Sequence, residues 1–180
     1  EGTPQGGVVS PILANVYLHE VLDVWFEREV KPRLQGDATL IRYADDFVIV
    51  FEWEADARRV MEVLPKRFGK YSLTLHPEKT KLLKFTRPRP TRRKDDDEDG
   101  PGSFDFLGLT HHWRRSRKGT MIVYRKTARS RFTRGLARIR EWCRVNRHLP
   151  IAQQHRLLVA KLRGHNNYYG LIGNHEALAR

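Results

Sequence analysis

The chain has 180 residues, and its 34 lysines and arginines outnumber its 21 aspartates and glutamates, which gives a formal net charge of +13 at pH 7. With 39% hydrophobic residues it is too apolar for a disordered tail and long enough to form a substantial core. Its single cysteine excludes an internal disulfide framework, and no apolar run approaches the ~18–20 residues that span a bilayer, so we expect no membrane association and a reducing, cytoplasmic location.

The positive charge is concentrated in the last part of the chain. Residues 1–110 hold 17 basic and 19 acidic side chains, whereas residues 111–180 hold 17 basic and 2 acidic ones. A segregated excess of this kind marks a face that binds a polyanion. The composition therefore predicts a near-neutral first part and a nucleic-acid-binding second part.

The first part alternates between helical and strand patterns. In chain order it predicts a helix, a hairpin of two strands, a second helix, and a turn into a third strand, over residues 11–30, 40–43 with 47–51, 54–68, and 73–85. Ser10 is expected to cap the first helix and Gly69 to end the second. The second hairpin strand is continuously apolar, which predicts burial on both of its faces.

The later part changes from a polar loop to strands and then to basic helices. Residues 87–102 combine prolines with the acidic run 95–99 and predict a solvated loop. Two strands are expected over 104–110 and 119–125, around a basic turn. Two helices follow, one to about residue 147 with an apolar stripe at Phe132, Leu136, Ile139 and Cys143, and one over about 150–163 with Leu158 and Leu162 inward.

Two adjacent aspartates, Asp45 and Asp46, stand at the tip of the predicted hairpin. Taken alone, such a pair is most simply an ordinary turn exposed to water. At the end of a buried sheet, however, two neighbouring carboxylates repel each other unless a cation is present. Mg²⁺ is the oxygen-seeking ion that suits such a pair, so the tip is a candidate magnesium site, with the plain turn as the alternative.

A complete two-metal site needs a third carboxylate from a neighbouring strand, because adjacent strand residues point to opposite faces. We expect no second acidic residue inside a strand beside this hairpin, since Asp23 would lie in a helix, Asp37 in a loop and residues 95–99 in the solvated tract. The chain also begins without a methionine or a secretory signal. These observations predict that a preceding segment of a longer protein supplies the missing ligand.

Four ordered sequence blocks carry a family resemblance: Gly2–Asn15 (GTPQGGVVSPILAN), Tyr43–Asp46 (YADD), Leu73–Lys81 (LTLHPEKTK) and Phe104–Gly108 (FDFLG). Together they resemble the reverse transcriptases encoded by bacterial group II introns. The resemblance implies an α+β fold, with a reverse-transcriptase palm built as an antiparallel sheet with helices on one face, followed by an α-helical thumb/maturase segment. Residues 1–110 would be the carboxy-terminal part of the palm with the insertion 87–102, and residues 111–180 the end of the primer-grip hairpin and the start of the thumb.

The resemblance also implies a function, an RNA-directed DNA polymerase that transfers nucleotides from dNTPs by two-metal magnesium catalysis. Asp45 and Asp46 would bind the metal with an aspartate outside this chain, and Lys79 would act near the nucleotide's phosphates. The template and nucleotide pocket would include four residues, Pro4, Gln5, Gly6 and Tyr43. Leu107 and Gly108 would form the primer grip, with a packed hydrophobic strand as the alternative.

The basic helices would contact nucleic-acid phosphates, and in this family the region also binds intron RNA as a maturase. The candidate contacts are Arg129, Arg134, Arg138, Arg140 and Arg144. The motif Asn166–Tyr169 resembles a family motif too, although its tyrosines are more simply a packed helix face. The implied partners are template and intron RNA, a DNA primer, dNTPs and an amino-terminal fingers and palm segment, in a bacterial, nucleoid-associated setting.

Other functions remain open at this point. Without the fingers and the first catalytic aspartate, these 180 residues are expected to be inactive alone. One alternative is a non-catalytic, RNA-binding maturase remnant. Another is a reverse transcriptase of a retron, a diversity-generating element or a CRISPR locus, since these share the palm motifs.

Overall fold

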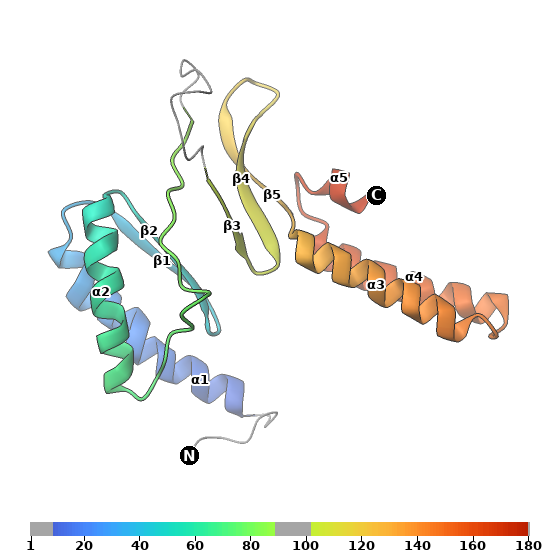
Figure 1. The fold of residues 1–180 in the computed structure, drawn as a ribbon, viewed down its shortest axis with the longest axis horizontal. Coiled ribbons are helices and arrows are strands. Elements are labelled where there is room, and N and C mark those ends of the chain that lie inside the picture. Colours follow the sequence, from blue (N-terminus) through green and yellow to red (C-terminus); the bar gives the residue numbers. More distant parts are fainter. Residues whose placement is uncertain (1–8, 89–101, 180) are drawn as a thin grey trace. The chain divides into compact units, whose positions relative to one another are not determined.

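The computed structural model describes residues 9–88 and 102–179. The chain divides into two compact units, Glu1–Leu82 and Leu83–Arg180, and in each of them helices accompany an antiparallel sheet (Figure 1). The predicted α+β class, with a palm-like sheet followed by a helical segment, is confirmed. The division lies after Leu82, whereas the functional boundary expected at residue 110 falls inside one strand and stays a prediction.

The first unit begins with one long helical segment. Helix α1 (Ser10–Leu18) continues as the π-helical turns η1 (His19–Val24) and η2 (Phe26–Val30) and ends in a 3₁₀ turn, η3 (Lys31–Arg33). Its extent agrees with the prediction, but the cap does not. The carbonyl of Val9 already accepts bonds from the amides of Ile12 and Leu13, so Val9 occupies the cap position and Ser10 is the first helical residue.

The predicted hairpin is present as β1 (Ala38–Tyr43) and β2 (Asp46–Phe51), paired from Ala38 opposite Phe51 to Tyr43 opposite Asp46. One face, with Leu40 and Ile49, packs on the core. The other face leaves Ile41 and Val50 about half exposed, at 49% and 53%. The expected burial of β2 on both faces is therefore wrong, because the described helices cover only one side of this two-stranded sheet.

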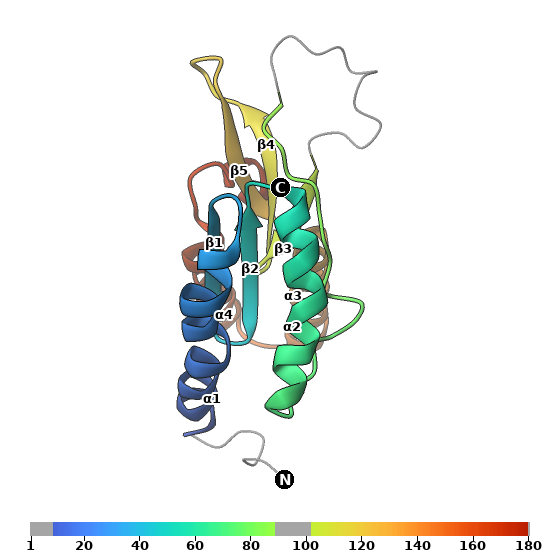
Figure 2. The same cartoon turned by 90° about the vertical axis from the view of Figure 1, so that its left-hand side faces the viewer.

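The core of the first unit joins the helical segment to the second helix, α2 (Glu54–Lys70). Both pack on the same face of the hairpin, and Figure 2 shows its strands between the two ribbons in this view. The buried cluster draws on η1, the adjoining Trp25, η2, β1 and α2, and consists of Leu22, Trp25, Phe26, Ala38, Leu64 and Phe68. Burying each large apolar side chain contributes about 1.5–3 kcal/mol. Helix α2 continues past Gly69, so the expected stop there is wrong by one residue; the first amide beyond the helix, that of Tyr71, still bonds back to Phe68.

The segment after α2 is a coil rather than the expected strand over 73–85. Leu73 and Leu75 pack against the core, which explains their apolar spacing. The backbone then turns, because the amides of Lys79 and Thr80 both bond to the carbonyl of His76. Within the described residues no strand pairs with this segment, so its apolar residues are buried without a sheet.

The second unit has a three-stranded sheet in the order β3–β4–β5, formed by Ser103–Phe106, Leu109–Arg115 and Met121–Thr127. The two strands predicted here are therefore three. Leu107 (φ 51°) and Gly108 (φ 76°) both adopt left-handed backbone and close a two-residue turn inside the expected strand 104–110. Periodicity alone does not reveal a turn this short.

Two long helices follow the sheet, α3 (Arg129–Asn146) and α4 (Ile151–Tyr169), and a short α5 (His175–Leu178) ends the unit. Helix α4 runs six residues beyond its predicted end. The apolar stripe of α3 is also displaced from the prediction, since Leu136 and Cys143 are exposed. The half-buried residues are instead Phe132, Gly135, Ile139, Trp142 and Asn146.

Gly135 marks the side of α3 that faces α4. A Cβ atom at this position would lie 3.9 Å from His165 Cε1 on α4, an ordinary van der Waals contact. Leu158 is half-buried as expected, whereas Leu162 is 41% exposed. Within the described ranges, no helix is long and apolar enough to cross a membrane.

Candidate active site

The tip of the β1–β2 hairpin presents two carboxylates to solvent. Ala44 and Asp45 form the two-residue turn, and Ala44 has a left-handed backbone with φ 53°. Asp46 is the first residue of β2 and lies opposite Tyr43. Both aspartates are exposed, and neither forms an ion pair or a side-chain hydrogen bond with the described residues.

This arrangement fits part of a magnesium site. Adjacent, unpaired carboxylates offer the hard oxygen ligands that Mg²⁺ prefers. Within residues 9–88 and 102–179, however, no group of three or more acidic, histidine or cysteine side chains could hold a metal ion. The described residues therefore provide two candidate ligands from one hairpin tip.

A partly buried ion pair lies beside the hairpin, and the sequence patterns did not indicate it. Arg42 of β1 forms a bidentate pair with Asp23 of η1, at 2.7 Å from Nε to Oδ1 and 2.6 Å from Nη2 to Oδ2. The hydrogen bond from Arg42 holds the pKa of the Asp23 carboxyl below its usual value, against the opposing effect of burial. A single arginine among the apolar residues of a strand was the signal that could have found this pair.

Of the other site residues predicted in the first unit, the structure describes Lys79 and Tyr43. Lys79 is exposed in the turn that follows His76, and within the described part of the chain no hydrogen bond or ion pair joins its side chain to either aspartate. Tyr43 is 67% exposed next to the tip. Pro4, Gln5 and Gly6 lie outside the described residues, as does the acidic run 95–99.

In the second unit, the predicted primer-grip residues Leu107 and Gly108 form the β3–β4 turn. The hydroxyl of Tyr168, near the end of α4, donates to the Leu107 carbonyl at 2.9 Å. A Cβ atom on Gly108 would lie 3.0 Å from the hydroxyl of Tyr169. The amide of Ala128 bonds to the Gly108 carbonyl at 3.0 Å, so the turn is held between α4 and the start of α3. The tyrosines of the Asn166–Tyr169 motif thus contact this turn.

A second anchor of this region is Asn174, which is fully buried. Its Oδ1 accepts the amide of Thr127 at 2.8 Å, and its Nδ2 donates to the Thr127 hydroxyl at 2.8 Å and to the Tyr169 carbonyl at 2.7 Å. It therefore ties the end of β5 to the end of α4. A lone asparagine in a polar tail carried no signal for this role.

The predicted phosphate contacts are all exposed on α3. With about 100° per residue, they separate into two rows that flank the buried stripe, Arg134 with Arg138 and Arg129 with Arg140 and Arg144. Arg144 is also held by Glu141 at 2.8 Å and 3.0 Å. Among the described residues no ion pair holds the other four, which leaves them available to a polyanion.

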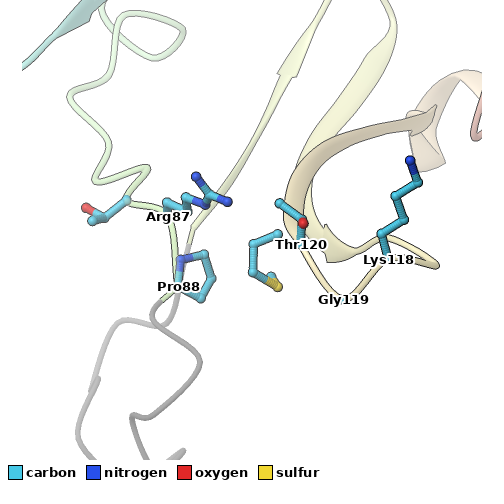
Figure 3. A pocket seen from close by; sticks show the side chains of 7 residues that line it. Arg87, Pro88, Lys118, Gly119 and Thr120 are labelled. Carbon is cyan, nitrogen blue, oxygen red and sulfur yellow. The ribbon is translucent and has the colours of Figure 1, made fainter.

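A shallow cavity of about 650 Å³ lies between the coil at residues 86–88 and the β4–β5 turn (Figure 3). Arg87 and Lys118 are its ionisable lining residues, and the lining includes no acidic group. It therefore offers no acid–base pair and no metal ligands.

Comparisons with known proteins place these features in a family. Residues 1–111 match the family model described as reverse transcriptase (RNA-dependent DNA polymerase). The group II intron-encoded protein LtrA of Lactococcus lactis subsp. cremoris is 33% identical over 96 residues, which cover 48% of this chain and 16% of LtrA. Protein YkfC of Escherichia coli K12 is 28% identical over 156 residues, 68% of this chain and 35% of YkfC. The matches thus span about a sixth and a third of these relatives.

Proposed function

The chain belongs to the reverse transcriptase (RNA-dependent DNA polymerase) family, and we propose that it forms the catalytic hairpin and the start of the nucleic-acid clamp of a group II intron-encoded reverse transcriptase. The observation that carries this proposal is the Tyr-Ala-Asp-Asp turn, which presents two exposed and unpaired carboxylates at one tip. Likeness to LtrA favours the intron class over retron, diversity-generating and CRISPR-associated enzymes.

In this proposal Asp45 is the main ligand and Asp46 the secondary ligand of Mg²⁺, with a further aspartate from outside the chain. When bound, magnesium activates the attacking oxygen and stabilises the leaving one during nucleotidyl transfer. The carboxylates hold the cation at the tip, where their exposure leaves room for a nucleotide and a primer end. Lys79 supplies a positive charge toward the nucleotide's phosphates, and Pro4, Gln5, Gly6 and Tyr43 line the template and nucleotide pocket.

The second unit holds the polymer. The Leu107–Gly108 turn acts as the primer grip, supported by the hydrogen bond from Tyr168. The exposed arginines of α3 contact phosphates of template and intron RNA, so binding is steeply dependent on salt. Residues 1–110 then serve as palm, with the insertion 87–102, and residues 111–180 as the end of the primer-grip hairpin and the start of the thumb and maturase region, in a bacterial cytoplasm close to the nucleoid.

Primer extension on an RNA template tests the catalytic part. The 180 residues alone are expected to extend a primer negligibly, because the family's metal site takes an aspartate outside the matched blocks. Adding an amino-terminal fingers and palm segment should give Mg²⁺-dependent synthesis that Asp45→Asn abolishes. Glu62→Gln on the exposed side of α2 removes the same charge elsewhere and should leave synthesis unchanged. Robust extension by the chain alone would refute the need for a second segment.

A second candidate function is RNA binding without catalysis, favoured by the exposed arginines of α3. It predicts salt-sensitive RNA binding that survives Asp45→Asn together with Asp46→Asn. If RNA binding persists while the supplemented chain makes no DNA, this candidate replaces the polymerase.

A further inference from the structure

The guanidinium of Arg42 joins the catalytic turn to the first helix. Besides its two bonds to Asp23, its Nη1 donates to the side-chain oxygen of Asn15 at 2.9 Å and to the backbone carbonyl of Ala44 at 2.8 Å. We propose that Arg42 is a positioning residue, which fixes the Ala44–Asp45 peptide against α1 and η1 and so aims the Asp45 carboxylate at its metal. This inference rests on the metal-binding role of Asp45 in the proposed function.

The carbonyl that Arg42 holds belongs to the peptide bond that leads into Asp45. Ala44 adopts a left-handed backbone with φ 53°, which is unfavourable for a residue other than glycine. A charge-assisted hydrogen bond to its carbonyl helps to hold this conformation. If that bond is lost, the peptide can rotate, and the following carboxylate changes direction with it.

The support behind Arg42 comes from two turns of one helical segment. Asn15 lies on α1 and Asp23 on η1, and His19 also contacts the Asp23 carboxylate at 3.3 Å. The side chains of Arg42 and Asp23 are only 13% and 26% exposed, so solvent screens this pair less than a surface ion pair. The planar guanidinium serves all three partners at once, which the single ammonium group of lysine cannot reproduce.

Asp45 depends on this support because its own side chain has none. Within the described residues its carboxylate makes no hydrogen bond or ion pair that would fix its direction. Its placement is therefore set through the backbone of the turn. An ion pair that served folding alone would need only the Arg42–Asp23 contact, whereas the bond to the Ala44 carbonyl acts on the turn itself.

A substitution of Arg42 has two opposite effects on cation binding. Removing its positive charge strengthens the attraction of a cation to the two aspartates. Removing its hydrogen bond to the turn weakens cation binding, because the Asp45 carboxylate is no longer held in position. Arg42→Lys keeps the charge and removes the fork, so it isolates the geometric effect. Asn15→Ala keeps the ion pair with Asp23 and removes only one partner that orients Nη1.

The test uses the full 180-residue chain with Mn²⁺ as a paramagnetic probe. NMR detects its binding as a broadening of the backbone amide signals of residues 44–46. We expect Mn²⁺ to bind at the tip of the unaltered chain and Asp45→Ala to remove it. Arg42→Lys should weaken this binding on the order of 10-fold and shift the amide signals of the turn. Asn15→Ala should weaken Mn²⁺ binding and shift the turn signals to a smaller extent, and should leave the melting temperature unchanged. The matched control is Arg58→Lys, which alters an exposed arginine paired with Glu54 on α2 and should change neither quantity.

The outcomes distinguish the positioning role of Arg42 from the metal-binding role of Asp45. If Arg42→Lys and Asn15→Ala bind Mn²⁺ like the unaltered chain and their turn signals do not move, the positioning role is overturned while the metal role of Asp45 stands. If the unaltered chain shows no Mn²⁺ at the tip that Asp45→Ala removes, the two aspartates do not hold a cation without the further ligand, and the positioning proposal is overturned. If Arg42→Lys does not fold, Asn15→Ala decides the question.

Discussion

Replacing Asn174 tests how the second unit holds the end of β5 against the end of α4. Asn174 is fully buried and makes hydrogen bonds of 2.7–2.8 Å to two atoms of Thr127 and to the carbonyl of Tyr169. Asn174→Ala removes all of them. The hydroxyl of Thr127 can rotate to another partner, and the Tyr169 carbonyl keeps its hydrogen bond from the Leu171 amide. The Thr127 amide has a fixed direction and loses its partner.

Each buried backbone group left without a partner costs about 1–3 kcal/mol. One such group gives a loss on the order of 2 kcal/mol. For a unit of this size, 1 kcal/mol corresponds to about 4–8 °C in melting temperature. The expected decrease is therefore about 8–16 °C.

The assay is thermal and urea unfolding of the full chain, followed by the fluorescence of its tryptophans. Because the first unit also contains tryptophans, amide hydrogen exchange at β5 and α4 assigns the change to the second unit. Asn167→Ala, an exposed position on α4, is the matched control and should stay within about 0.5 kcal/mol. Equal stability of the two variants would refute the assignment of Asn174 as a buried anchor.

Three further predictions concern the core, the pH response and nucleic-acid binding. Phe26→Ala, at a fully buried position, should destabilise the first unit by about 3–5 kcal/mol in urea unfolding, whereas Ile12→Ala, 63% exposed, should have little effect. Burial lowers the pKa of His111, so the unfolded chain takes up protons more readily; the stability contributed by the neutral ring is full above about pH 6.5 and is lost as the pH falls below it. We therefore expect a lower urea midpoint at pH 5.5 than at pH 7.5, and a smaller difference between the two in His111→Phe. Identical midpoints at the two pH values would contradict this expectation. Changing Arg134 and Arg138 to glutamine should weaken RNA binding in filter assays and reduce the salt slope of log K by about 0.7 for each phosphate that is no longer neutralised; an unchanged slope would exclude them from the interface.

Local sequence patterns determined most of the elements in the first unit. The two helices over residues 11–30 and 54–68 and the turn between residues 43 and 47 depend on neighbours within a few residues. All three are present, with Ala44 and Asp45 as the two turn residues. The family was predicted from four motif blocks and is confirmed by the match over residues 1–111. A motif is defined by residue types at a fixed spacing along the chain, so it can be recognised in the sequence before the fold is known.

Burial was predicted less well, because it depends on what lies opposite a residue. The apolar run of β2 predicted two covered faces, but the described helices cover one. Leu73 and Leu75 have an apolar spacing that serves the core from a coil instead of a strand. On α3, the side that includes Gly135 faces α4, and the local apolar spacing did not predict it.

The sequence by itself therefore determined the family, the acidic tip of the hairpin and the basic character of the last helices. Only the tertiary structure revealed that Arg42 reaches Asp23, Asn15 and the turn carbonyl, and that Asn174 joins β5 to α4. The reason is physical. A motif or a periodicity is a property of neighbouring residues, whereas a buried hydrogen bond needs a donor and an acceptor that folding brings together, here 19 and 27 positions apart for Arg42 and 47 for Asn174 with Thr127.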